Sequence, residues 1–293
     1  MGTFNNTKPF SLYDLTINLS LMDSMYFLRL LRLGALVSSI GTTVFFAENS
    51  TSAAGSPALA SDCPRLNFDS DNYANALAKN TLAQKNNVAL FRAMSQLWLN
   101  KDITAANATI RDTYRDLLDG TEVLTPEIAD EKFKWQMRLW VRIYGMFNQR
   151  DGWFTGRLEP ETEAVFHELF WKYAFAKSTI DRADEQYTWF IQGSENHDLM
   201  DLSNSFLALE ALSKLPDYAE KKLRDDQTVV EHAKAWNAHY RRYADSRVAN
   251  GLLIECASSI YGKYSIPELV NMADFADDAV IRKKMTMLLD VLW

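Results

Sequence analysis

Residues 159–173 read EPETEAVFHELFWKY, and this stretch decides the fold class. Glu159-Pro160-Glu161 is a helix start, because proline is tolerated in the first turn, where its missing N–H costs no hydrogen bond. The apolar residues that follow recur at three- and four-residue steps, which is the spacing of one helix face. They are Val165, Phe166, Leu169, Phe170 and Tyr173. The stretch is therefore predicted to form a helix with one buried face.

Helix signals of the same kind recur along the chain. In Thr125-Pro126-Glu127 the threonine can cap a helix, the proline fits its first turn, and the acid lies near the positive end of the helix dipole. This helix is predicted to run to about Gln149. Further helices are predicted over residues 71–99, 103–118, 181–192, 198–212, 228–246, 252–261, 267–276 and 278–293.

The pattern predicts an all-α protein of stacked antiparallel helical hairpins. No run alternates apolar and polar residues between hairpin turns, so strands are not expected. The loops alternate between short and long, which favours pairing of successive helices. Stacked hairpins give either a solenoid or a closed ring. The lack of a fixed-period repeat in the sequence weighs against tetratricopeptide and ankyrin arrays.

Composition limits the possible functions. The 293 residues are 47% hydrophobic and 12% aromatic, which suffices for a sizeable core in one large domain or two small ones. The net charge of -7 and the pI near 5.2 argue against non-specific nucleic-acid binding. The sequence has no HExxH, CxxC or P-loop motif, so no metal or other cofactor is expected.

The first 60 residues have the pattern of a secretory signal. Arg29 and Arg32 precede a mostly apolar run over 33–47, and Ala58-Leu59-Ala60 resembles a cleavage site. Serines, threonines and a glycine make the apolar run a poor permanent membrane span. We expect cleavage after Ala60, a secreted or periplasmic location without stable membrane insertion, and one helical domain over 61–293. A retained signal anchor is the alternative.

Three further features concern processing and the end of the chain. Cys63 and Cys256 could pair in an exported protein, or Cys256 could be a buried free thiol. Asn107-Ala108-Thr109 is a glycosylation sequon if the host is eukaryotic. The apolar stripe of the last helix continues to Trp293 without a glycine or a polar tail, so we expect the chain to be the first part of a longer protein.

The segment 187–201, YTWFIQGSENHDLMD, is the first candidate site. It gathers an indole, an imidazole, an amide and two carboxylates around Gly193-Ser194, a mixture that suits the binding and deprotonation of a polar substrate. These residues are Trp189, Glu195, Asn196, His197 and Asp198. The alternative is a structural loop, in which Gly193 ends a helix and the asparagine and aspartate form turns.

The segment 250–276, NGLLIECASSIYGKYSIPELVNMADFA, is the second candidate site. Glu255, Ser258, Tyr261 and Tyr264 follow one another at three-residue steps, so the first three would share a face at the end of a helix. The alternative is a corner between two helices, with tyrosines that pack on the core.

The two segments together resemble the (α/α) toroid polysaccharide lyases, particularly the alginate lyases of that fold. Those enzymes carry an Asn-His pair at a helix start and a later Tyr-x-x-Tyr segment that leads into an apolar helix. Asn196-His197 is similar to the first motif. Tyr261-Gly262-Lys263-Tyr264, followed by Met272-Ala273-Asp274-Phe275-Ala276, is similar to the second. The resemblance covers about 189–293 and implies part or all of an (α/α) toroid.

The resemblance also implies a role for each matched residue. Asn196 would bind and neutralise the uronate carboxylate, and His197 would be the base or the partner that helps to remove the C5 proton. Tyr264 would protonate the leaving oxygen and, with some substrates, also act as the base, with Tyr261 as a neighbouring candidate. The family's arginine, seven residues before this tyrosine, falls at Ala257. The cations that could replace it are Arg241, Arg242, Arg247 and Lys263.

These residue types fit β-elimination. The carboxylate charge must be masked so that an enolate-like anion can form, and an amide N–H directed at that oxygen is a suitable donor. The proton must then pass to a group that titrates near neutral pH, for which histidine is the natural choice.

We therefore expect a secreted polysaccharide-active enzyme, a lyase that cleaves a uronate-containing polysaccharide or oligosaccharide. The first alternative is a glycoside hydrolase on the same fold, with two carboxylates from Glu195, Asp198 and Glu255. The second is a carbohydrate-binding or scaffold protein without turnover. The candidate substrate-binding residues are Trp189, Glu195, Glu255, Arg242 and, as a sugar platform, Trp153. His232 and His239, seven residues apart, are expected to be structural.

Overall fold

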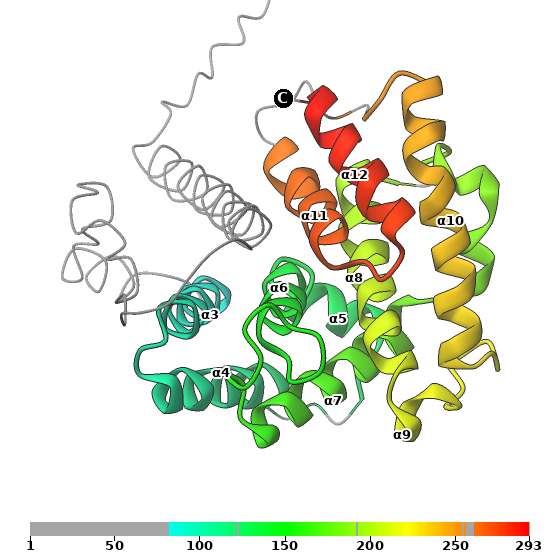
Figure 1. Cartoon of the computed structure of the whole chain (residues 1–293). Helices are drawn as coiled ribbons and strands as arrows, with labels where there is room; N and C mark the ends of the chain where they lie inside the picture. Colours follow the sequence, from blue (N-terminus) through cyan, green and yellow to red (C-terminus); the bar gives the residue numbers. More distant parts are fainter. Residues whose placement is uncertain are drawn as a thin grey trace, which may run out of the picture. The chain divides into compact units, whose positions relative to one another are not determined.

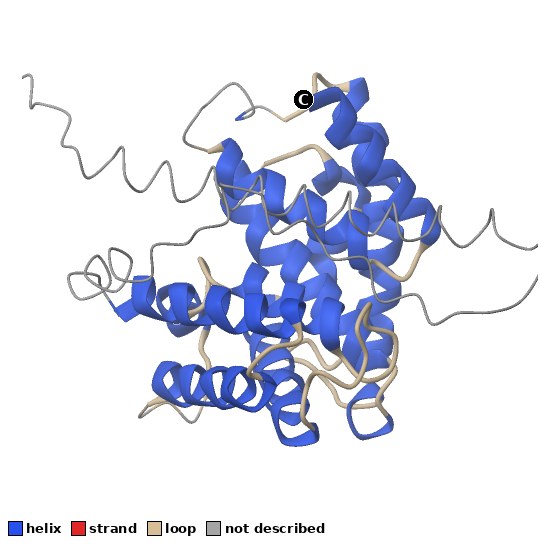
Figure 2. Cartoon of the chain, turned by 60° about the vertical axis from the view of Figure 1, so that its left-hand side comes forward, coloured by secondary structure: helices blue, strands red, loops and turns tan. Residues whose placement is uncertain are grey.

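The computed structural model describes residues 82–119, 121, 123–191, 193–253, 255 and 261–292. The chain divides into two compact units, Met1–Asp69 and Ser70–Trp293, and every described residue belongs to the second. Figure 2 shows that the secondary structure of the described residues is helical and contains no strand. One isolated antiparallel bridge joins Lys222 to Thr228. The prediction of an all-α protein is confirmed.

The helices follow one another through connections of unequal length (Figure 1). Their bounds are α3 Leu82–Leu99, α4 Ile103–Leu118, α5 Pro126–Lys132, α6 Met137–Phe147, α7 Pro160–Lys177, α8 Glu195–Ser213, α9 Pro216–Ala219, α10 Val229–Ala249, α11 Gly262–Phe275 and α12 Ala279–Leu292. Two 3-10 helices, η2 Ile180–Ala183 and η3 Glu185–Thr188, lie between α7 and α8.

The centre of the described unit is α8, which packs against α6, α7, α10 and α11 (Figure 1). Almost all of its side chains are buried, serines and an asparagine included. Consecutive helices also pack in pairs, α3 with α4, α7 with α8 and α11 with α12. This pairing is the one expected of helical hairpins. The ring of a toroid remains a prediction.

Local signals place several helix starts where they were predicted. Pro160 is the first residue of α7, and Phe166, Leu169 and Phe170 are buried on its inner face. The Thr125 side chain caps α5 by accepting a hydrogen bond from the Ile128 amide. At α10, Thr228 and Glu231 form a capping box, which satisfies two amides of the first turn.

Four segments differ from prediction. The helix predicted from Thr125 to Gln149 is interrupted at 133–136. In place of the α-helix predicted over 181–192, the described residues form the two 3-10 helices η2 and η3, and the Asp184 side chain caps the second of them. The predicted helix at 252–261 does not begin at Leu252, because both Gly251 and Leu252 have positive φ. The next helix, α11, starts at Gly262, so Pro267 lies inside it and only the bond to the Lys263 carbonyl is lost.

Asn107, the asparagine of the glycosylation sequon, lies in the core. The side chain of Asn107 is fully buried. Its Nδ2 donates to the carbonyls of Ile103 and Arg157, and its Oδ1 accepts from the amide of Glu159. The asparagine therefore joins α4 to the start of α7, and its amide nitrogen is not available for a glycan.

The predicted secretory signal and both cysteines lie outside the described residues, with Cys63 in the first unit and Cys256 just before α11. Within the described ranges, no helix combines the length and the apolar character that a membrane crossing requires.

Candidate functional site

Trp135 is in ring contact with both His197 and Tyr264. The centroid of its ring is 5.6 Å from that of His197, in an edge-on arrangement, and 4.8 Å from that of Tyr264. The three residues come from different elements: the link between α5 and α6, the first turn of α8 and the first turn of α11. The lyase resemblance assigns proton transfer to His197 and Tyr264. The centroids of their two rings are therefore no farther apart than these two distances added together.

The position of Trp135 follows from its neighbours in the link. Phe133 and Met137, on either side, are fully buried and anchor the link in the core. Trp135 points the other way and is 37% exposed. An exposed indole is a common platform for a flat or ring-shaped ligand, because it offers a large rigid apolar face at little entropic cost.

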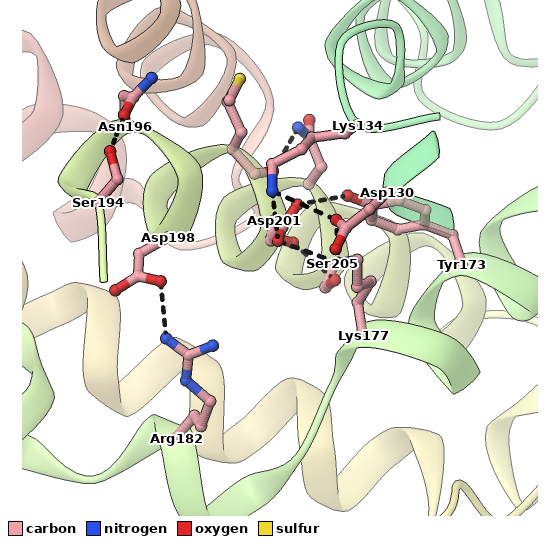
Figure 3. Close-up of polar contacts among 12 residues, drawn as sticks. Asp130, Lys134, Tyr173, Lys177, Arg182, Ser194, Asn196, Asp198, Asp201 and Ser205 are labelled. Atoms are coloured by element: carbon pink, nitrogen blue, oxygen red, sulfur yellow. Dashed lines mark hydrogen bonds and ion pairs between the residues drawn. The ribbon is translucent and has the colours of Figure 1, made fainter. Parts of the chain in front are cut away.

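A polar network fixes this link against α7 and α8 (Figure 3). Lys177 donates hydrogen bonds to Asp130 and to Asp201, the latter at 3.1 Å. Lys134, next to Trp135 in the chain, forms ion pairs with the same two carboxylates. Tyr173 donates to Asp201 at 3.4 Å. Burial raises the pKa of Asp201, and the two lysines partly oppose that effect. Asp201 is one turn after His197, so the network holds Trp135 next to the histidine.

Arg138 supplies positive charge beside Tyr264. Its guanidinium carbon is 5.7 Å from the centre of the Tyr264 ring, and the ammonium of Lys263 is 5.0 Å from that centre. The Nη1 atom of Arg138 is buried without a hydrogen-bond partner among the described residues. Burial lowers the pKa of Arg138, but an arginine remains charged in proteins.

The nearest acid to this arginine is largely neutral. Glu268 is fully buried, and burial raises its pKa to about 8, although Arg138 acts in the opposite direction. The two side chains form no ion pair within the described part of the chain. The charge of Arg138 is therefore poorly compensated, which favours an anion close to Tyr264.

Asn196 is buried, and both its backbone and its side-chain oxygen are held by hydrogen bonds. Its backbone N–H donates to Glu255 Oε2 at 2.8 Å, and its Oδ1 accepts from the Ser194 hydroxyl. Ser194 also approaches the other oxygen of Glu255 at 3.0 Å. The Nδ2 group of Asn196, which points away from Ser194 in Figure 3, donates to no described residue. His197, half-buried, likewise makes only its ring contact with Trp135.

The carboxylates predicted to bind or hydrolyse sugar are engaged in structural contacts. Glu195 is buried, and its two oxygens accept from Arg247 Nη1 at 2.7 Å and from the Glu255 amide at 2.8 Å. Asp198 forms an ion pair with Arg182 at 3.0 Å (Figure 3). Because Glu255 caps the start of α8, all three carboxylates stabilise the helix that carries His197.

Three other predicted residues lie apart from this cluster. Arg242 is exposed on α10 and pairs with Glu185. Trp189 follows η3, is 46% exposed and makes no ring contact with the described residues. Trp153 packs on Phe275 with ring centroids 5.1 Å apart. Tyr264 and Phe275 are near opposite ends of α11, about 16 Å apart at the helical rise.

Tyr261, in contrast, belongs to the same corner as Tyr264. It is the residue before α11, three positions from Tyr264, and is 44% exposed. Sequence reasoning did not identify Trp135 and Arg138. The signal that could have identified them is the run KFKWQMR at 132–138, where bases and aromatic residues alternate within an otherwise helical pattern.

A serine, a histidine and an aspartate also meet inside the core. Ser178 Oγ and Asp225 Oδ1 are each 2.8 Å from a ring nitrogen of His232. Ser178 and His232 are buried, and the Trp236 indole N–H donates to the same serine oxygen. A nucleophile must reach its substrate, so we interpret this set as a tie between α7, α10 and the preceding loop. The expectation that His232 and His239 are structural agrees with their burial.

No protein-family model, curated protein or solved structure matches this chain. Among the described residues, no group of three or more histidine, cysteine or acidic side chains could hold a metal ion.

Proposed function

We propose that this protein is a polysaccharide-active enzyme, a lyase that cleaves a uronate-containing polysaccharide by β-elimination. The observation that supports this proposal is the contact of both His197 and Tyr264 with one exposed indole, that of Trp135. The reaction needs a base and an acid near the same sugar ring, and an indole beside both is a surface on which such a ring can pack.

Each step can be assigned to a side chain of this cluster. Arg138, with the free amide of Asn196, neutralises the uronate carboxylate and stabilises the enolate-like anion. His197 takes the C5 proton, a double bond forms between C4 and C5, and the C4–O bond breaks. Tyr264 gives its proton to the departing oxygen. Trp135 holds a sugar ring between base and acid.

The hydrolase alternative has weaker support. Glycoside hydrolysis needs one carboxylic acid and one carboxylate on either side of the scissile bond. Glu195 is engaged by Arg247 and Asp198 by Arg182, and the Glu255 carboxylate is engaged by one amide and one hydroxyl at the start of α8. Export to the exterior or periplasm is part of the proposal and rests on the sequence of residues 1–60.

The test is incubation of the full chain with alginate, with dextran as a neutral polymer. A lyase produces a conjugated double bond that absorbs ultraviolet light, and the signal should appear with alginate alone. His197→Ala and Tyr264→Phe should each reduce it at least 100-fold, a typical contribution of an acid or base. His167→Ala is the matched control and should retain activity. New reducing ends without absorbance would indicate a hydrolase, and no product from either polymer would contradict enzymatic function on them.

A further inference from the structure

A second candidate site lies at the other end of α11, away from Tyr264. A half-open cavity of about 280 Å³ is lined by residues of α6, α8, the end of α11 and the loop that follows α6. Its aromatic wall consists of Tyr144, Trp153, Phe170 and Phe275. The wall is tight where α6 meets α11, because a methyl group on Gly145 would come within 2.5 Å of the Phe275 ring.

The polar feature of this cavity is Glu210. Its side chain belongs to α8, lines the cavity and is only 6% exposed. Oε2 accepts a hydrogen bond from the Asp277 amide at 3.1 Å. Oε1 has no hydrogen-bond partner in the described ranges of the chain, and Glu210 forms no ion pair there. A nearly buried carboxyl with one free oxygen facing a cavity is a ready acceptor for a ligand.

The other charges around the cavity are already balanced. Lys214 bridges Asp151 and Asp277 at 2.8 and 2.6 Å. Arg142 pairs with Asp274 at 2.8 Å. The Arg282 guanidinium donates to the carbonyls of Ala276 and Asp277, which follow α11. Among the described charged side chains that line the cavity, Arg282 and Glu210 are the two without an ion pair.

The surroundings of Glu210 favour its protonated form. Burial and the charge of Asp277 raise its pKa to about 8, with Lys214 and the Asp277 amide acting in the opposite direction. The titratable and charged groups that face it from the surrounding elements are Tyr144, Asp151, Lys214, Asp274, Asp277 and Arg282, and Asp278 adds a further negative charge.

Size and chemistry together define the ligand class. Ligand pockets usually measure about 300–1,000 Å³, so this cavity is small enough to exclude a polymer and suits a single ring. Aromatic faces attract cations, and a buried carboxylate without an ion-pair partner is stabilised by a cation. We infer that this cavity binds a small ring-bearing amine, whose ammonium group pairs with Glu210 and whose ring packs on the aromatic wall.

The first experiment is a calorimetric titration of the full chain at pH 7 with benzylamine, benzyl alcohol and benzoate. These probes share a ring and differ in charge. Benzylamine should bind at least tenfold more tightly than the other two. Equal affinity for benzyl alcohol, stronger binding of benzoate, or the absence of benzylamine binding would each overturn the inference.

The second measurement needs no variant. When an ammonium group binds, Glu210 must lose its proton, so titrations in two buffers with different ionisation enthalpies should show release of close to one proton per site. Binding without proton release would contradict the assignment to Glu210, even if benzylamine affinity were high.

Variants then locate the site. Glu210→Gln keeps the shape of the side chain and should lose at least tenfold in benzylamine affinity, together with the proton release. The exposed Glu220→Gln is the matched control and should change neither. If Glu210→Gln fails to fold, Trp153→Leu tests the aromatic wall and should weaken benzylamine at least tenfold. Unchanged benzylamine affinity in whichever of these two variants folds would refute the site.

Discussion

The guanidinium of Arg138 lies over the ring of Tyr264 at 5.7 Å, although the two residues belong to α6 and α11. In the lyase pattern a cation is expected at the position of Ala257, before the tyrosine in the chain. Here the positive charge closest to Tyr264 comes from α6 and from the adjacent Lys263. The fold can thus place a cation beside the tyrosine without an arginine in that segment.

Replacement of Arg138 should separate function from stability. Arg138→Met should reduce the initial rate of elimination on alginate at least tenfold. It should leave the free energy of unfolding unchanged or raise it by about 1 kcal/mol, because a buried donor without a partner is removed. Rates and chemical denaturation measure the two effects. Arg242→Met, on an exposed ion pair, should alter neither. An unfolded Arg138→Met protein would mean that the arginine is structural.

Glu195 is expected to matter for folding. Glu195→Ala should lower the free energy of unfolding by about 3 kcal/mol, because it leaves the charge of Arg247 buried without its partner. Urea denaturation measures the change. Glu185→Ala breaks an exposed pair and should cost less than about 1 kcal/mol. Similar losses in both variants would contradict the buried pair.

Two glycines should respond oppositely to alanine. At Gly145 the added methyl would overlap the Phe275 ring, so Gly145→Ala should destabilise the protein by about 1–3 kcal/mol. At Gly262 the nearest atom beyond the helix backbone is 3.9 Å away, so Gly262→Ala should be neutral or stabilise by less than about 1 kcal/mol. Thermal unfolding of both variants measures the contrast. A stable Gly145→Ala protein would show that α6 and α11 are less closely packed.

His239 should make the protein sensitive to mild acid. Burial lowers its pKa to about 4, below the ordinary value of about 6.5. The unfolded chain therefore binds a proton first, and stability should fall as pH decreases from 6.5 to 4, by about 3 kcal/mol in total. His239→Phe should flatten this part of the curve, since the ring packs among Trp236, Tyr240 and Tyr243. The free energy of unfolding, measured by urea denaturation, is compared between the original chain and His239→Phe over this pH range. An equal dependence on pH in both would rule out His239 as the cause.

Elements with strong local signals were predictable from the sequence. Pro160 with the apolar spacing after it defines α7, and the Thr228–Glu231 pair defines the start of α10. The interruption between α5 and α6 was not predictable from the sequence, because residues 132–138 contain no glycine or proline and are compatible with a continuous helix. Burial of Phe133 and Met137 fixes the interruption, and that burial depends on helices distant in sequence.

The same distinction applies to the candidate site. Asn196-His197 and the Tyr261–Tyr264 spacing are local patterns, so sequence reasoning could select them. Trp135 and Arg138 join them only through packing, and no local pattern shows that contact. Conversely, the carboxylate of Glu195 could bind a substrate, and only its burial against Arg247 shows that its role is structural.

The start of α8 and Glu255 exchange hydrogen bonds in both directions. Glu255 accepts from the Asn196 amide, and Glu195 accepts from the Glu255 amide. His197, the next residue in α8, therefore stands on a helix start that these two bonds already hold. Its ring, like that of Tyr264, contacts the Trp135 indole. A ligand that binds there would meet a preorganised first turn of α8, so little binding free energy would be lost in ordering it.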